Sequence, residues 1–234
     1  MVARKRFNPR LRSAVDYVRR GAAIADIGTD HAYLPIFLLR EGIAERAIAC
    51  DIGRGPIDRA RENIASAGLS DRISTLRTDG LHGVEPFHPD HILIFGMGGE
   101  LIVKILSEAP WVLDASIRLI LQPMSRVEVL RRYLWENGFS IVGETLSRED
   151  DRIYQTICAE WRGRSEAFTS LDCLIGKREC NAASPLYIPF LKQKIRVAEQ
   201  ILAGRSQAKT ADIGVQQEEL QALKERLLEI GGIT

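Results

Sequence analysis

The sequence has no long hydrophobic run, and aromatic residues make up only 6% of it. Its apolar runs end after about six to eight residues, too few for a helix that crosses a bilayer or for the core of a secretory signal. The N-terminus carries charge from Arg4 onward. These absences predict a cytoplasmic protein without a membrane span.

Cysteine is also scarce, and none of the cysteines stand in the C-x-x-C spacing of zinc sites and redox pairs. The four residues are Cys50, Cys158, Cys173 and Cys180. The spacing gives no support for a metal site, and we expect no bound metal. Reduced, unpaired thiols within a core are the prediction.

The chain lacks a strong overall charge, because its formal net charge is +1. That balance alone does not indicate a nucleic-acid partner. Residues 1–20 are different: they hold seven lysines and arginines against Asp16 alone. This basic segment, which includes Arg10 and Arg12, either contacts phosphates or forms a solvated helix face.

Short apolar runs and amphipathic segments alternate along most of the chain. Strands are predicted at 22–27, 47–51, 73–76, 91–95 and 117–121, and helices at 11–20, 31–40, 56–67, 100–106 and 127–135. Such alternation predicts an α/β fold with a Rossmann-like parallel sheet covered on both faces. Two further apolar runs, at 139–146 and 153–161, predict a β-hairpin at one edge of the sheet.

Composition changes after Trp161, where two long helical segments follow a mixed connection. They cover 186–203 and about 210–230, and in the second Leu220, Leu223, Leu227 and Ile230 recur at helical spacing. The pattern predicts a coiled-coil-like α-helical hairpin. We therefore expect a first domain at 1–161 and a second at 162–234. The hairpin would serve either as a packing or dimerisation arm, leaving monomer and homodimer open, or as a substrate-binding arm.

Functional residues of a parallel α/β sheet should follow the carboxyl ends of its strands. The first strand ends in D-I-G-T-D-H, residues 26–31. A dinucleotide fingerprint would have glycines where this chain has Asp30 and Tyr33. A carboxylate there repels a pyrophosphate, so the loop suits a ligand that carries positive charge and no phosphate. S-adenosylmethionine meets both conditions.

The next three strand ends fit the same ligand. Asp51 can accept from both hydroxyls of a ribose, and Asp79 with Gly80 follows the third strand, where a carboxylate can accept from an adenine amino group. Residues 96–99, G-M-G-G, leave open backbone where a flat substrate would approach the methyl group. Together these features favour a class I methyltransferase over a dehydrogenase.

Five sequence blocks sharpen this interpretation: D-I-G-T-D-H-A-Y-L-P at 26–35, G-P at 55–56, D-G-L at 79–81, G-M-G-G at 96–99 and L-I-L-Q-P at 119–123. In kind and order they resemble the bacterial tRNA (adenine(22)-N(1))-methyltransferases, the TrmK family. The resemblance implies a Rossmann-like methyltransferase domain with a C-terminal helical hairpin. It also implies S-adenosyl-L-methionine as cofactor, tRNA as substrate and methyl transfer to N1 of an adenine, at position 22. Three positions depart from the family pattern: Met124, Gln155 and Lys177.

The candidate site residues follow from the strand ends and the resemblance. For the cofactor they are Asp26, Gly28, Thr29, Asp30, His31, Asp51, Ile52, Asp79, Gly80, Gly96 and Met97. The catalytic candidates are Asp30, Gly98 and Gln122. Asp30 either stabilises the cationic adenine product or caps the helix that follows. Gly98 belongs to the wall where the base enters, and Gln122 either reads an adenine edge or caps backbone.

A base within folded tRNA must leave its stack to be methylated. The protein must therefore also contact phosphates of the tRNA outside the active site. The candidates for RNA contact are Arg10, Arg12, Tyr33, Arg126, Lys192, Lys194 and Arg196, with Arg131 and Arg132 beside them. For Tyr33 we expect packing within its helix rather than stacking. Two other functions stay open from sequence: a methyltransferase of another RNA or a small molecule, and a non-catalytic cofactor-binding protein.

Overall fold

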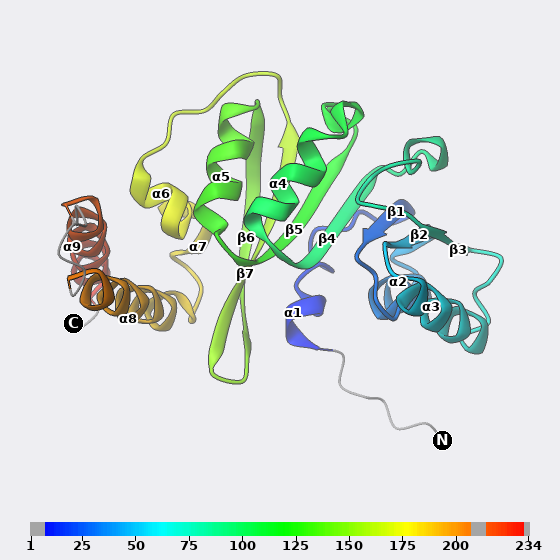
Figure 1. The fold of residues 1–234 in the computed structure, drawn as a ribbon, viewed down its shortest axis with the longest axis horizontal. Helices are drawn as coiled ribbons and strands as arrows, with labels where there is room; N and C mark the ends of the chain where they lie inside the picture. The colour runs from blue at the N-terminus through cyan, green and yellow to red at the C-terminus, as the bar shows by residue number, and fades with distance from the viewer. Residues whose placement is uncertain (1–7, 207–213, 232–234) are drawn as a thin grey trace.

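The structure, a computed structural model, describes residues 8–206 and 214–231. A single seven-stranded sheet runs through it (Figure 1), in the order β3-β2-β1-β4-β5-β7-β6. The strands are β1 Ala22–Ile27, β2 Ala44–Asp51, β3 Ile73–Arg77, β4 His91–Gly98, β5 Arg118–Ser125, β6 Phe139–Glu149 and β7 Arg152–Trp161. The α-helices are α1 Pro9–Arg12, α2 Tyr33–Arg40, α3 Arg54–Ser66, α4 Gly99–Ser107, α5 Val127–Glu136, α6 Ser170–Ile175, α7 Arg178–Asn181, α8 Tyr187–Ser206 and α9 Gly214–Glu229, with 3-10 turns at Glu85–Phe87 and Pro110–Val112.

Strands β1 to β5 pair in parallel, and α2 to α5 connect or follow them. Because both faces of the strands are covered, their apolar runs are buried in two clusters, one packed by α4 and α5 and the other by α2 and α3. This confirms the Rossmann-like prediction. The predicted edge hairpin is also present, but β7 lies between β5 and β6 and runs antiparallel to both.

The predicted helix at 11–20 is wrong. Only α1 is helical, and residues 13–18 form turns that cross the sheet over β7 and β6. The hydroxyls of Ser13 and Thr156 lie 2.5 Å apart, and those of Tyr17 and Thr145 2.8 Å apart. Ala14 is buried against the sheet. These tertiary contacts outweigh the helical propensity of the segment.

A third core joins the C-terminal helices to the edge of the sheet. Leu146 and Ile153 of the β6–β7 hairpin pack with residues of α6, α8 and α9. Helices α8 and α9 form the predicted hairpin (Figure 1), with Lys224 Nζ 2.8 Å from Glu199 Oε1 between them. Leu223 and Leu227 are buried, as their spacing predicts. The domain boundary at 161/162 stays a prediction, and residues 210–213 of the expected helix lie outside the described residues.

Cys50, Cys158 and Cys173 are buried thiols, and Cys180 is half-buried. Burial raises the pKa of Cys50 and of Cys158 to about 12. Both therefore stay protonated at neutral pH and pack as small apolar groups. Within the described part of the chain, no helix combines the length and apolarity that a membrane crossing requires.

Candidate active site

The carboxyl ends of β1 and β4 meet at Gly28 and Met97. Gly28 has a φ of +74°, and a Cβ there would overlap the Met97 side chain. The positive φ is what favours glycine, because the overlapping Met97 atom is the flexible end of its side chain. The contact places the loop after β1 against the G-M-G-G segment that ends β4, as the sequence predicts for a single site.

Asp26, at the end of β1, is a buried carboxylate. Its Oδ2 accepts a 2.6 Å hydrogen bond from the Thr29 hydroxyl, which is also buried. Burial raises the pKa of Asp26 to about 6; the Thr29 hydrogen bond opposes this rise, and the nearby negative charge of Asp51 adds to it. A buried carboxylate with a second one beside it is stabilised by a cation placed between them.

Asp51 ends β2 and is held by the backbone on both sides. Its Oδ1 accepts from the Gly53 amide at 2.8 Å, and its Oδ2 accepts from the Asp30 amide at 3.3 Å. These bonds fix the carboxylate at the mouth of the site. The next residue, Ile52, is 62% exposed. An exposed apolar side chain beside a fixed carboxylate offers one surface to a base and another to ribose hydroxyls.

Asp30 does not cap the helix that follows. Helix α2 begins at Tyr33, its N-cap is Ala32, and no side chain bonds to that end. Asp30 has a φ of +50°, and its exposed carboxylate lies 3.4 Å from His31 Nε2 and 3.5 Å from Arg59 Nη2. A non-glycine residue in this region of φ is uncommon and is often found at functional sites.

The expectation that Tyr33 packs within its helix is wrong. Its side chain is 50% exposed, and its ring stacks on that of His31 with centroids 5.1 Å apart. The two rings therefore form an aromatic surface next to Asp30. Arg59, which reaches this surface from α3, had no signal in the sequence, because the contact joins residues 29 positions apart.

Two predicted glycine positions have packing roles. Gly80, with a φ of +55°, packs against Ile105 of α4, and a Cβ at Gly98 would contact the Ser125 hydroxyl at 3.3 Å. Gly98 thus allows β4 and β5 to approach as α4 begins. The exposed Asp79 lies at the β3 end of the same sheet edge, next to Thr78, whose amide donates to the Asp51 carbonyl at 3.0 Å.

Gln122 is fully buried in β5, and both ends of its amide are bonded within the protein. Its Oε1 accepts from Arg10 Nη1 at 2.7 Å, and its Nε2 donates to the Pro123 carbonyl at 2.9 Å. The geometry therefore matches the backbone-capping alternative better than direct reading of a base. Arg10 also binds Glu149 Oε2 through Nε at 3.1 Å.

The comparisons agree with this geometry. A family model described as a methyltransferase domain matches residues 7–157. The chain is 31% identical over 226 residues to the tRNA (adenine(22)-N(1))-methyltransferase of Bacillus subtilis (strain 168). The match covers 95% of this chain and 94% of that protein. The chain belongs to this methyltransferase family.

Solved structures of similar proteins extend the likeness to the whole fold. The B. subtilis M1A22 tRNA methyltransferase TrmK superposes with a TM-score of 0.78 at 30% identity, covering 97% of each chain. A Streptococcus pneumoniae protein in complex with S-adenosyl-L-methionine gives 0.81 at 33% identity, covering 93% of this chain and 98% of that one. TrmK of M. capricolum in complex with S-adenosyl-homocysteine gives 0.74 at 28% identity, covering 96% of each.

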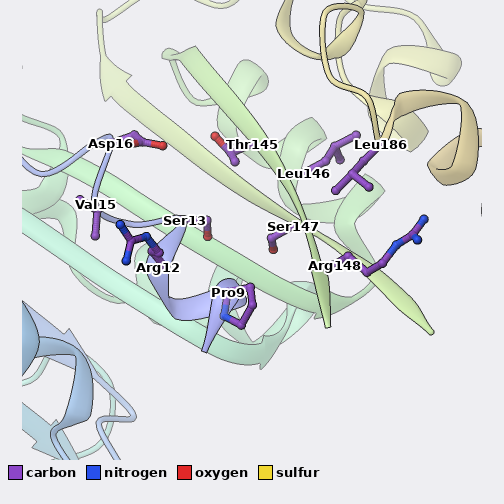
Figure 2. A pocket seen from close by; sticks show the side chains of 10 residues that line it. All are labelled: Pro9, Arg12, Ser13, Val15, Asp16, Thr145, Leu146, Ser147, Arg148 and Leu186. Carbon is purple, nitrogen blue, oxygen red and sulfur yellow. The ribbon is translucent and has the colours of Figure 1, made fainter. Parts of the chain in front are cut away.

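In this member of the family, much of the basic N-terminal segment is bound to the sheet. Arg10 is mostly buried, and Arg19 pairs with Glu160 at 2.7 Å. Arg12 is exposed beside a hollow of about 370 Å³ between this segment and β6 (Figure 2). Figure 2 shows Arg12 and Arg148 on opposite sides of the residues that line the hollow, with their guanidinium ends pointing away from each other. Residues 4–6 lie outside the described residues.

The structure separates the other cations that the sequence grouped. Arg126 is exposed but lies within 3.3 Å of Glu100 and Glu128. Arg131 is fully buried, with its Nε 2.7 Å from Glu144 Oε1, so it cannot contact RNA. Arg132 is exposed and lies over the ring of Phe168.

Of the three cations on α8 that the sequence predicts for RNA contact, two share an exposed face of the helix and the third does not. Lys192 and Arg196 are exposed four positions apart, on one helix face. Lys194 is half-buried on another face of the helix, because a step of two residues rotates a helix by about 200°. Its ammonium lies 5.5 Å from the centroid of the Phe190 ring, and burial, with the nearby Arg131 charge, lowers the pKa of Lys194 to about 8.

Proposed function

We propose that this protein transfers a methyl group from S-adenosyl-L-methionine to N1 of an adenine in tRNA, the adenine at position 22. The observation that supports the proposal most is the buried Asp26 carboxylate beside Asp51, at the edge where β1, β2 and β4 end. The family relation supports the choice of adenine 22 as the target nucleotide, because the B. subtilis relative is a tRNA (adenine(22)-N(1))-methyltransferase.

The residues at this edge fit the cofactor. When bound, S-adenosylmethionine supplies an electrophilic methyl group on a sulfonium. Asp26 offers negative charge to the cationic part of the cofactor, Asp51 accepts from ribose hydroxyls, and Ile52 packs on the adenine. The Met97 side chain occupies the place that a Cβ on Gly28 would take, which keeps the loop after β1 in contact with the end of β4. Thr29, His31, Asp79, Gly80 and Gly96 complete the proposed lining.

The reaction requires accurate placement of the adenine more than it requires a general base. N1 of adenine has a free lone pair at neutral pH, so alignment and exclusion of water dominate the rate. The protein must also stabilise the positive charge that the adenine ring gains. On the β1 rim the candidate for that role is Asp30, whose carboxylate is exposed and held by Arg59 and His31. Carboxylates on the β5–β7 side of the site are the alternative.

The tRNA backbone requires contacts outside the site. We propose that Arg12, Lys192 and Arg196 supply them, since all three are exposed. Arg126 can contribute if it exchanges its carboxylate partners for phosphate. The cytoplasmic location expected from the sequence is part of this proposal, and both monomer and homodimer remain compatible with it.

The test is incubation with methyl-labelled S-adenosylmethionine and an unmodified tRNA transcript, followed by nucleoside mass spectrometry. The expected product is 1-methyladenosine, and it should be lost when the adenine at position 22 is replaced by guanine. Label in another nucleoside would refute the proposed target. Cofactor binding without label transfer to tRNA or to a metabolite extract would support the non-catalytic alternative.

A further inference from the structure

A hollow of about 430 Å³ lies between α1, the end of β5 and the β6–β7 hairpin. It is lined by Arg10, Met124, Glu149, Asp150, Asp151, Arg152 and Tyr154. Arg10 connects the two regions, because its Nη1 lies 3.7 Å from the position that a Cβ on Gly96 would take. Arg10 therefore lines the hollow and also lies beside Gly96 of the G-M-G-G segment.

Two side chains give this hollow apolar surfaces of the kind that a base requires. Tyr154 of β7 is half-buried, and Met124 at the end of β5 is 42% exposed although it is apolar. The Arg10 guanidinium lies 5.8 Å from the centroid of the Tyr154 ring. Arg10 is itself fixed by Gln122 and Glu149, so the ring faces the hollow in a defined position. Aromatic rings and guanidinium planes are the usual platforms for unstacked bases.

The charges around the hollow favour a cation. Glu149 is already paired with Arg10, which leaves the carboxylates of Asp150 and Asp151 beside the guanidinium of Arg152 and a net charge of −1 in the lining. This net negative charge makes the hollow better suited to a cation than to the phosphates of the RNA backbone. It is suited to a base that becomes positive: as N1 bonds to the methyl carbon, the C–S electron pair stays on sulfur and the charge passes to the adenine ring.

We propose that this hollow, the acceptor pocket, receives the target adenine, with Tyr154 as its stacking surface and the hairpin carboxylates stabilising the methylated, cationic ring. The inference rests on the proposed function and specifies the subsite that the function needs. It assigns Arg10 a positioning role, because Arg10 holds Tyr154 while its own contacts are with protein groups. It also places the base on the β5–β7 side of Gly96, opposite the aromatic surface of Tyr33 and His31.

The first test removes the ring. Tyr154→Leu should raise KM for the tRNA transcript, or lower the single-turnover rate, by about tenfold, since base–aromatic stacking is lost. Tyr154→Phe keeps the ring and should recover most of the rate. S-adenosylmethionine binding, measured by calorimetry, should be unchanged in both. Tyr133→Leu, the same change on α5, is the matched control and should leave the rate as in the wild type.

The second test removes charge without changing shape. Asp150→Asn with Asp151→Asn should lower kcat several-fold, because the cationic ring loses stabilisation, and should lower KM for tRNA as well, because repulsion of phosphates falls. If the two aspartates had only a structural role, the substitutions would not lower kcat and the KM for tRNA together. Asparagine suits position 150, where φ is +51°.

The outcomes separate the two proposals. If the wild type transfers no methyl group to tRNA, the proposed function fails. If the wild type methylates tRNA and Tyr154→Leu behaves like it, the acceptor pocket is wrong while the function stands. A larger loss with Tyr33→Leu than with Tyr154→Leu would place the base at the opposite rim and overturn the pocket.

Discussion

Protonation of Asp26 should control cofactor affinity below neutral pH. Burial raises the pKa of this carboxyl from 3.8 to about 6, so at pH 7 it is mostly ionised and at pH 5 mostly protonated. The rise corresponds to about 3 kcal/mol against the ionised form. A cationic ligand beside Asp26 offsets that cost, and its binding should return the pKa toward the ordinary value. We therefore expect the cofactor to bind about tenfold more weakly at pH 5 than at pH 7.

The assay is titration calorimetry of S-adenosylmethionine at half-unit steps from pH 5 to pH 7.5. Near pH 6, binding should also release protons, which shows as a dependence of the heat on the buffer. Asp26→Asn should bind more weakly at pH 7 and lose the pH dependence. Because His31 and Asp30 are intact in that variant, the difference from the wild type reports Asp26. A wild-type affinity that is flat between pH 5 and pH 7 would refute the contact between Asp26 and the cofactor.

The same carboxyl has the opposite effect on the stability of the protein without cofactor. Its pKa is higher in the folded state, so the folded protein binds more protons than the unfolded chain between about pH 4 and pH 6. The Asp26 contribution to the free energy of unfolding should then fall as pH rises through this window. Urea unfolding of the wild type against Asp26→Asn measures it, and an equal pH dependence in both would contradict the burial argument.

Three further changes test other parts of the structure. Gly28→Ala should weaken cofactor binding in calorimetry. A Cβ there is strained by the positive φ, at a cost of about 1–2 kcal/mol, and it also meets Met97. Gly68→Ala, at a positive φ with open space around it, is the control and should bind the cofactor normally. Arg131→Met leaves a buried carboxylate on β6 unpaired and should lower the free energy of unfolding in urea by about 3–5 kcal/mol; a loss below 1 kcal/mol would contradict the burial of that pair. Lys192→Glu with Arg196→Glu should raise the tRNA dissociation constant and reduce its salt dependence by about two ion equivalents; unchanged binding would remove α8 from the interface.

The sequence was most informative where topology forces residues together. Parallel strands end at one edge, so Asp26, Asp51 and the glycines at 96–99 could be placed in one site from their order alone. The same reasoning predicted the edge hairpin. It did not show that β7 inserts between β5 and β6, because the pairing of a hairpin alone leaves open which of its two strands joins β5.

The misses have local physical causes. The helix expected at 11–20 gives way to side-chain bonds with β6 and β7, which no window of sequence contains. Lys194 was grouped with Lys192 by a spacing of two, although a helix face repeats at three and four. The roles of Arg10 and Tyr154 depend on partners more than 100 residues away, such as Gln122, and no periodicity carries that information.

The strap formed by residues 8–20 has a consequence for how the enzyme matures. Its hydroxyl pairs join positions 128 and 143 residues apart, so the part of the chain made first is anchored to strands made late. During synthesis the half that holds the proposed cofactor contacts, β1 to β4, can assemble early. The acceptor side must wait for β6 and β7 to emerge and for Arg10 to close on Gln122. A chain made only as far as residue 138 lacks β6 and β7 and therefore every hairpin residue that lines the proposed acceptor pocket.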